Sequence, residues 1–430
     1  MVKPRSNRVL SAGLLLGTVL VLGCKSQNSG GDATGGSPGT GGATGSGGGH
    51  WVGTWTGAPQ LTETGNLPPT PLSNLTLRQV VHVSLGGSQI RVRLSNEFGD
   101  GPVTVNQAHV AVCPATPVNS TIDTTTDKAL SFSGSASTTI ATGMAVWSDP
   151  IDFSLAALSN LAITTAFGSV PTNVTGHPGS RTTSYEQAGV DVSAANMTAA
   201  QTADHWYIIS GVDVMASSAA MGVVVLGDSI SDGRGTTTNG NDRWPDDLAR
   251  RLQANAPTAT VAVMNQGIGG NRILHDVRGD SGLRRFDRDV LAQPGVTHVI
   301  VLLGTNDLRN RWAKPEEEVT AEQMIGGLKQ MVMRAHTRGI KIFGGTLTPF
   351  ENETFLIGAW TPAREAVRQA VNAWIRDGGA FDAVIDFDKG VRDPEHPARM
   401  LPNYDCGDHL HQSDAGYNRL GDIIDLALFD

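Results

Sequence analysis

The spacing of hydrophobic residues changes once along the chain, close to residue 217. Before that point, apolar and polar residues alternate in short segments that turn residues separate, and a period of two is typical of antiparallel strands. The clearest alternating segments lie at residues 79–85, 89–95, 103–112 and 160–167. We therefore predict a β-sandwich or jelly-roll-like domain over residues 50–216.

Beyond residue 217, continuous apolar runs alternate with stretches of helical period. This order is typical of a parallel sheet that helices cover on both faces. The apolar runs lie at residues 223–227, 260–264, 298–304, 340–348 and 383–388. The helical stretches lie at residues 243–254, 321–338, 362–378 and 414–429. Residues 217–430 are therefore predicted to form a doubly wound α/β domain.

The first 49 residues follow neither pattern. Residues 1–23 join a basic start to an apolar stretch that is short for a membrane span, which predicts an export signal. The stretch ends in VLGC, which resembles a bacterial lipobox and makes Cys24 the predicted lipidation site. Residues 24–49 are rich in Gly, Ser and Thr and predict a flexible tether. We expect an exported lipoprotein at the cell surface or in the periplasm that touches the membrane only through this N-terminal lipid.

The net charge and the spacing of motifs argue against nucleic acid, metals and cofactors as binding partners. The 430 residues include 41 acidic and 32 basic side chains, which gives a net charge of −9. A chain with this balance lacks the basic surface that a phosphate backbone requires, so nucleic acid is not an expected partner. The sequence shows neither metal-ligand spacing nor a phosphate-binding glycine loop after a strand, and we expect no metal and no cofactor.

Short polar segments follow three of the apolar runs. They are GDS at 227–229, NQGIGGN at 265–271 and GTND at 304–307. Because ligands bind at the carboxyl ends of parallel strands, we expect these segments to meet at one site. Ser229 is the candidate nucleophile of an ester hydrolase. The backbone N–H groups of Ser229 and Gly270 and the side-chain amide of Asn306 are the candidate oxyanion hole.

Each of these residues also has a structural interpretation. Ser229 would suit a plain turn, and Asn306 would suit a helix cap. Gly267 and Gly269 compete with Gly270 for the role of N–H donor. The sequence alone leaves these alternatives open.

The catalytic base is expected in the segment YDCGDHLHQSDAGY near the C-terminus. Asp408 precedes His411 by three residues, so its carboxylate can reach the imidazole Nδ1 and leave Nε2 for Ser229. A second pair, Asp405 and His409, lies in the same segment and remains an alternative.

The four blocks GDSI, NQGIGG, GTND and DHLH occur in the order of the SGNH (GDSL) hydrolase superfamily, which residues 219–430 resemble. The resemblance implies Ser229 as nucleophile, Asp408 and His411 as its partners, and Gly270 and Asn306 as oxyanion donors. The family's D-x-x-H spacing favours this pair over Asp405 and His409. One departure is Gln412-Ser413, where the family usually has Pro-Asn after the histidine.

The β-rich region also resembles a known domain, on the segments WVGTWTGAP and GHPGSRTTSYE. A similar domain precedes the hydrolase domain in a secreted, xylan-esterase-like GDSL subgroup. The two resemblances together imply an extracytoplasmic serine esterase that removes short acyl groups, above all acetyl, from a substrate such as an acetylated polysaccharide. A general GDSL lipase or arylesterase is the first alternative, and a catalytically inert carbohydrate-binding lipoprotein is the second.

Two cysteines remain after lipidation of Cys24. In an oxidising compartment, Cys113 and Cys406 would be able to form one disulfide, which would fasten the catalytic loop to the β domain. Two separate thiols are the alternative.

Overall fold

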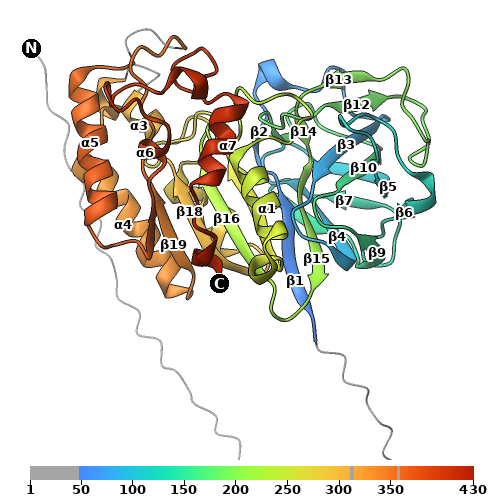
Figure 1. Ribbon diagram of the computed structural model, residues 1–430. Coiled ribbons are helices and arrows are strands. Elements are labelled where there is room, and N and C mark those ends of the chain that lie inside the picture. Colours follow the sequence, from blue (N-terminus) through green and yellow to red (C-terminus); the bar gives the residue numbers. More distant parts are fainter. Residues whose placement is uncertain (1–47, 310–313, 356–358) are drawn as a thin grey trace, which may run out of the picture. The chain divides into compact units, whose positions relative to one another are not determined.

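The chain forms antiparallel sheets before residue 217 and one parallel sheet after it (Figure 1), as its hydrophobic pattern predicts. The computed structural model describes residues 48–309, 314–355 and 359–430. The predicted export signal, Cys24 and almost all of the predicted tether lie outside these ranges. Within them, no helix is both long and apolar enough to cross a membrane.

Three antiparallel sheets make up the region before residue 217. The first contains β1 (His50–Thr56), β4 (Gly87–Asn96), β8 (Met144–Trp147), β9 (Ile151–Leu155) and β15 (Ile209–Ala216). The second contains β3 (Thr76–His82), β5 (Val103–Val112), β6 (Lys128–Ala129), β7 (Thr138–Ile140), β10 (Asn160–Phe167), β12 (Ser184–Gln187) and β13 (Gln201–Ala203). The third contains β2 (Gln60–Leu61), β11 (Thr175–His177) and β14 (Trp206–Tyr207).

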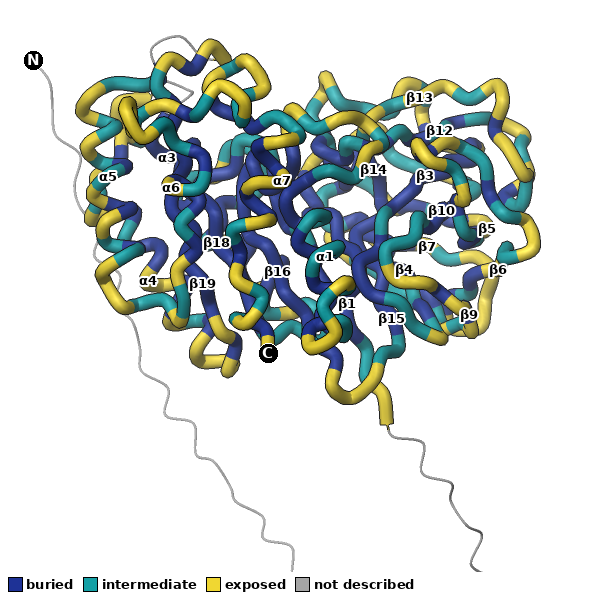
Figure 2. Tube along the Cα trace, viewed as in Figure 1, coloured by how far each residue is buried: buried dark blue, intermediate teal, exposed yellow. Residues whose placement is uncertain are grey.

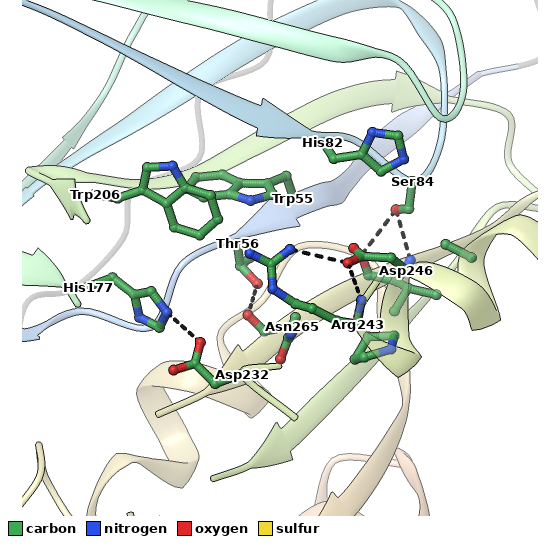
Figure 3. A pocket seen from close by; sticks show the side chains of 13 residues that line it. Trp55, Thr56, His82, Ser84, His177, Trp206, Asp232, Arg243, Asp246 and Asn265 are labelled. Carbon is green, nitrogen blue, oxygen red and sulfur yellow. Dashed lines mark hydrogen bonds and ion pairs between the residues drawn. The ribbon is translucent and has the colours of Figure 1, made fainter. Parts of the chain in front are cut away.

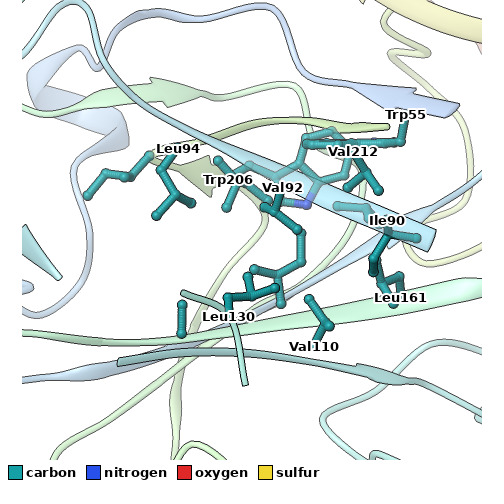
Figure 4. Packing of buried hydrophobic residues seen from close by; sticks show 14 of the residues in the cluster. Trp55, Ile90, Val92, Leu94, Val110, Leu130, Leu161, Trp206 and Val212 are labelled. Atoms are coloured by element: carbon teal, nitrogen blue, oxygen red, sulfur yellow. The ribbon is translucent and has the colours of Figure 1, made fainter. Parts of the chain in front are cut away.

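The two larger sheets share one hydrophobic core (Figure 4). Val92 and Val212 from the first sheet lie in the same buried cluster as Val110 and Leu161 from the second. Alternate residues of each strand point into this core, which explains the period of two in the sequence. The predicted sandwich-like β domain is therefore confirmed.

The parallel sheet lies in the order β17-β16-β18-β19-β20. Its strands are β16 (Met221–Gly227), β17 (Val261–Gly267), β18 (Val296–Leu302), β19 (Lys341–Gly345) and β20 (Ala383–Ile385). The α-helices are α1 (Trp244–Ala254), α2 (Gly282–Phe286), α3 (Thr305–Arg309), α4 (Ala321–Thr337), α5 (Pro362–Asp377), α6 (Phe387–Val391) and α7 (Asp414–Asp422). Val224 packs with α4 and α5 on one face, and Val225 packs with α1 and α7 on the other. The predicted doubly wound α/β fold is thus confirmed.

The C-terminal helix is shorter than predicted. The hydrophobic pattern predicts one helix over 414–429, but α7 ends at Asp422 and a 3-10 turn covers Leu426–Phe429. Asp425 starts that turn, since its carboxylate accepts a hydrogen bond from the N–H of Ala427 at 3.0 Å. Ile424 and Phe429 still pack in the core. The sequence therefore keeps a helix-like spacing of apolar residues beyond the end of the helix.

The β region covers the exposed edge of the parallel sheet, at β17. The Ser84 hydroxyl donates to the Val263 carbonyl at 3.0 Å and accepts from the Val263 N–H at 2.9 Å. A side chain at Gly53 would collide with Met264, so glycine permits the close approach of β1. Covering this edge removes a site for unwanted strand pairing. Residues 47–430 form one compact unit, and most residues of the strands β1, β15 and β16 are buried (Figure 2). A division into two domains at residue 216 stays a prediction.

The possible disulfide between Cys113 and Cys406 does not form, and the structure has the alternative of two separate thiols. Both cysteines are free thiols. Cys113 is buried in a small cluster of the β region, where its thiol points to the Asn119 carbonyl at 3.5 Å. Cys406 is exposed in the loop that carries the predicted catalytic residues. The Cys113 side chain packs within its own region, so it does not fasten that loop.

Candidate active site

Ser229 lies in a tight turn directly after β16. Strand β16 ends at Gly227, and a Cβ there would lie only 2.1 Å from the Ser231 hydroxyl, so the turn needs glycine. The N–H of Asp232 then donates to the carbonyl of Asp228 at 2.9 Å and closes the turn. The turn places the Ser229 hydroxyl in a cleft at the carboxyl end of the sheet.

The buried guanidinium of Arg285 fixes the two strand ends beside this turn. It donates to the Gly227 carbonyl at 2.9 Å and to the Gln266 carbonyl at 2.7 Å. Asp289 matches its charge at 3.0 Å. Arg285 thereby holds the ends of β16 and β17 at a fixed distance. No motif in the sequence indicates this role of Arg285.

Three side chains form a continuous hydrogen-bonded chain. The Ser229 hydroxyl lies 2.9 Å from His411 Nε2, and His411 Nδ1 lies 2.7 Å from an Asp408 carboxylate oxygen. The other Asp408 oxygen accepts from the N–H of Leu410 at 3.0 Å and of His411 at 2.8 Å. An ionised carboxylate at Nδ1 requires the proton on that nitrogen, so Nε2 is left to accept the serine proton.

The surroundings of this pair set its charges. Burial acts to raise the Asp408 pKa, but the hydrogen bonds that its carboxylate accepts from His411 and Leu410 outweigh it and hold that pKa well below its ordinary value. Burial also lowers the His411 pKa, against the opposing effect of Asp408. Asp408 is therefore ionised and His411 neutral in the resting protein, which is the state that a general base needs.

The alternative pair forms a contact of its own, away from the serine. His409 Nδ1 lies 2.5 Å from Asp405, and the His409 side chain is exposed. His409 does not line the cleft that holds Ser229, whereas His411 does. The structure therefore brings the pair with D-x-x-H spacing to Ser229.

The three candidate glycines differ in what their N–H groups contact. The Gly267 N–H donates to the Asn265 side chain at 2.9 Å, and the Gly269 N–H donates to Asp232 at 3.2 Å. Within the part of the chain that the structure describes, the N–H groups of Gly270 and Ser229 have no acceptor, and both residues line the cleft. Their geometry suits donors to an oxyanion, and it favours Gly270 over its two competitors.

Asn306 lies in the cleft wall, but its amide is already engaged. Its Nδ2 donates to Asp228 at 3.1 Å and to the Asn271 carbonyl at 3.2 Å, while its Oδ1 accepts from Arg309 at 3.0 Å. These contacts fix which way the amide points. A substrate oxyanion would have to share one of the two amide hydrogens, so a role as donor stays a prediction.

The cleft has a volume of about 270 Å³ and both regions of the chain line it. The hydrolase region contributes Ser229, Gly270, Asn306 and His411. The β region contributes Gln60, Asn66, Pro178, Gly179, Arg181 and His205. Sequence reasoning missed this second set, because no spacing rule connects these residues to the catalytic motifs.

A junction behind the cleft holds the β region in place (Figure 3). His177 Nε2 lies 2.8 Å from Asp232, and its Nδ1 lies 3.0 Å from the Ala58 carbonyl. Arg243 donates to the carbonyl of Ser180. The cavity here holds only about 30 Å³, room for roughly one water molecule. The junction therefore fixes the segment after His177 and leaves no room for a substrate.

Asp405, Cys406 and Asp408 are the one group of possible metal ligands within the described residues, with their ligand atoms within 4.8 Å. Asp405 already binds His409, and Asp408 already binds His411. We assign no metal to this group.

A serine, histidine and aspartate joined by hydrogen bonds, at the carboxyl ends of parallel strands and beside two N–H groups, define a serine hydrolase. Residues 225–419 match the GDSL-like Lipase/Acylhydrolase family. This part of the chain is a domain of that family, and it is a GDSL-family hydrolase domain of esterase type.

Several solved structures are similar to this domain. Axe2, an acetylxylan esterase from Geobacillus stearothermophilus studied as a catalytic mutant, shows 21% identity over 47% of this chain and 91% of its own, with a TM-score of 0.37. Est24, a carbohydrate acetylesterase from Sinorhizobium meliloti, shows 17% identity over 47% and 94%, with a TM-score of 0.36. A GDSL-like lipase from Bacteroides thetaiotaomicron VPI-5482 shows 17% identity over 48% and 87%, with a TM-score of 0.36. No curated protein sequence matches the chain.

Replacing Gly270 tests its role as a donor. Gly270 has a φ of 83°, and a Cβ there would lie 2.9 Å from the Arg278 side chain. Gly270→Ala should displace the N–H group and lower kcat roughly 100-fold, which is typical for loss of an oxyanion donor. Gly269→Ala is the matched control, since its Cβ would make only ordinary contacts at 3.5 Å or more. Equal losses in the two variants would remove the special role of Gly270.

The pH dependence of kcat/KM tests the charge state of His411. Only neutral His411 accepts the serine proton, and its pKa is lowered from 6.5, so activity should persist below pH 6.5 and be lost as His411 becomes protonated. Asp228 is the competing group, because burial raises its pKa to about 7. Rates measured from pH 4.5 to 8 in the wild type and in Asp228→Asn separate the two groups. An acid limb above pH 6.5 in both proteins would contradict the assignment to His411.

Proposed function

We propose that the protein hydrolyses short-chain acyl esters, above all acetyl esters, of a carbohydrate alcohol. The observation that carries this proposal is the Ser229–His411–Asp408 chain, which opens into a small polar cleft. A general GDSL lipase or arylesterase is the alternative.

The lining of the cleft favours a small acyl group. Its volume of about 270 Å³ falls below the roughly 300–1,000 Å³ of most small-molecule pockets. Among the described residues that line it, Phe355 is the one large apolar side chain, and the others are polar, charged, glycine or proline. A long acyl chain would need an apolar channel, whereas a sugar ring is well served by amide, imidazole and guanidinium groups.

The proposed reaction has two halves. His411 Nε2 takes the proton of the Ser229 hydroxyl as the oxygen attacks the ester carbon, and the N–H groups of Ser229 and Gly270 receive the oxyanion. His411 then gives the proton to the departing alcohol, which leaves an acyl group on Ser229. A water molecule, deprotonated by His411, releases the acid and restores the serine.

Chain-length preference tests this proposal. We expect the protein, truncated before His50, to hydrolyse p-nitrophenyl acetate with a kcat/KM well above that for the C8 and C16 esters. Acetate release from acetylated polysaccharides would then identify the alcohol. Preference for the C8 or C16 ester would support the lipase alternative, and inactivity on all three would support an inert binding protein.

We also propose that the protein is exported and anchored by a lipid on Cys24. Cys24→Ser removes the thiol that would carry the lipid, so the variant should move from the membrane fraction to the soluble exported fraction or stay unprocessed. Detergent extraction and fractionation of both proteins provide the measurement. A variant that still needs detergent would show that another feature holds the protein at the membrane.

A further inference from the structure

The charged side chains around Ser229 are nearly all basic. Arg181, Arg234, Arg278 and Arg309 line the cleft, and Asp232 is the one acidic residue among the described lining residues. His177 and the Gly269 N–H already bind the Asp232 carboxylate. The chain as a whole carries a net charge of −9, so a site with four arginines and one acidic residue has a charge opposite to that of the whole chain.

Two of these arginines have carboxylate partners outside the cleft. Arg278 pairs with Glu63, and Arg309 binds both oxygens of Glu353 at 2.8 and 3.0 Å. Their charges are largely balanced within the protein, and Arg309 also orients Asn306. These two residues have structural roles that account for their presence.

Arg181 and Arg234 have no such partner. Neither forms an ion pair with any carboxylate in the described residues, and the Arg181 Nε is buried there without an acceptor. Arg234 is exposed, and its guanidinium lies 4.6 Å over the Phe355 ring without an ion pair among the described residues. A buried donor without an acceptor, such as the Arg181 Nε, destabilises the protein unless a ligand supplies the acceptor.

The backbone holds Arg181 in an unfavourable conformation. Its φ of 51° is in the left-handed region, which a long side chain seldom adopts. The Asn239 N–H donates to the Arg181 carbonyl at 2.9 Å, and Arg243 binds the carbonyl of Ser180 just before it. Asn239 also accepts from the Thr183 N–H at 2.8 Å. The β-region segment is thus fastened on both sides of Arg181, so that its side chain has a fixed base at the cleft.

Arg234 lies close to the His411 ring, and Arg181 lies close to Tyr417, which binds Arg234. Phe355, which Arg234 covers, meets the His411 ring edge-on with 6.0 Å between ring centres. The Tyr417 hydroxyl donates to the Arg234 carbonyl at 2.7 Å, and Arg181 is near enough to Tyr417 to act on its pKa, against the larger raising effect of burial. Because His411 delivers its proton to the departing alcohol, that alcohol has to approach the His411 ring, which Phe355 and Arg234 flank.

We infer that the alcohol portion of the substrate carries an anionic group, a carboxylate or a sulfate, which Arg181 and Arg234 bind beside the scissile ester. This inference rests on the proposed ester hydrolysis and narrows its substrate to esters of acidic sugars. A guanidinium binds such groups through two parallel N–H bonds, which gives orientation as well as attraction.

Matched substrates test the inference. O-acetylated methyl galacturonic acid and its uncharged methyl ester differ in the charge and in one methyl group, and an O-acetylated methyl galactoside 6-sulfate provides the sulfate arm. Acetate release should give the wild type a kcat/KM roughly 10- to 100-fold higher for at least one charged substrate than for the uncharged one. Added salt should reduce this ratio, since it screens the charges. Preference in either charged arm supports the inference and identifies the group.

Substitution of Arg181 tests whether the preference for charged substrates arises in the cleft. In Arg181→Gln the ratio of charged to uncharged kcat/KM should fall to near 1, and in Arg181→Glu it should invert. Arg338→Gln, at an exposed arginine after α4, is the matched control and should keep the wild-type ratio. A wild-type ratio near 1, or one that Arg181→Gln leaves unchanged, overturns the inference. Neither result affects the proposed esterase activity, which fails only if neither the charged nor the uncharged acetates are hydrolysed.

Discussion

Ser229→Ala should abolish ester hydrolysis while the protein stays folded. The hydroxyl supplies the bond to the acyl group, and without it the two-step reaction has no first step. Loss of the nucleophile should lower kcat by at least about 10,000-fold. The Ser229 side chain contacts His411 at the surface of a cleft and adds little to the core, so the melting temperature should change little. Release of p-nitrophenol and a thermal melt measure the two quantities.

Ser231→Ala is the matched control in the same turn. The Ser231 hydroxyl is buried, has no hydrogen-bond partner among the described residues, and packs against Gly227. Its removal should leave kcat/KM within about threefold of the wild type, as expected for a side chain without a polar contact. Residual activity of Ser229→Ala within tenfold of wild type would show that another group is the nucleophile.

The order of elements and the serine end of the site follow from local patterns. The run of valines before Ser229 predicts a buried strand, and the structure places successive valines on opposite faces of the sheet. The other local features also depend on residues close in sequence. Gly227 and Gly270 are required by the turns in which they lie, and Asp408 binds His411 three residues later. Information of this kind lies within one segment of the sequence, which is why it is readable there.

The rest of the site depends on contacts between distant segments. Arg181 comes from a loop whose position depends on His177 and Arg243, and no spacing in the sequence connects either residue to the catalytic motifs. The engagement of Asn306 by Asp228 likewise follows from the meeting of two strand ends. The choice between a disulfide and two separate thiols stayed open for the same reason, since sequence spacing carries no information on the direction of the Cys113 side chain. The α7 boundary was misplaced because Ile424 and Phe429 keep an apolar period after the helix has ended.

The arrangement gives the β region a specific part in the site. Asp232 lies three residues after Ser229, and His177 of the β region binds its carboxylate, while the same carboxylate accepts from the Gly269 N–H. The β region is therefore connected through one side chain to both the nucleophile turn and the glycine loop. It also covers β17 and supplies Arg181 to the cleft. A hydrolase region without it would lose one wall of the site and expose a strand edge.

His411→Asn should be nearly as damaging as the loss of the serine, whereas His409→Asn should have little effect. His411 alone of the two lies against the Ser229 hydroxyl, so its loss removes the base and the proton donor of both half-reactions. We expect kcat to fall by at least about 10,000-fold for His411→Asn and kcat/KM to stay within about threefold for His409→Asn.

Asparagine makes the comparison fair at both positions. His409 has a φ of 59°, a conformation that asparagine tolerates better than alanine, so the control adds little backbone strain. Asp405 keeps its bonds to the N–H groups of Gly407 at 2.8 Å and His409 at 3.0 Å, and these hold the loop when the His409 imidazole is removed. If His409→Asn proved the more severe change, Asp405 and His409 would be the catalytic pair, and the loop would have to rearrange to bring them to Ser229.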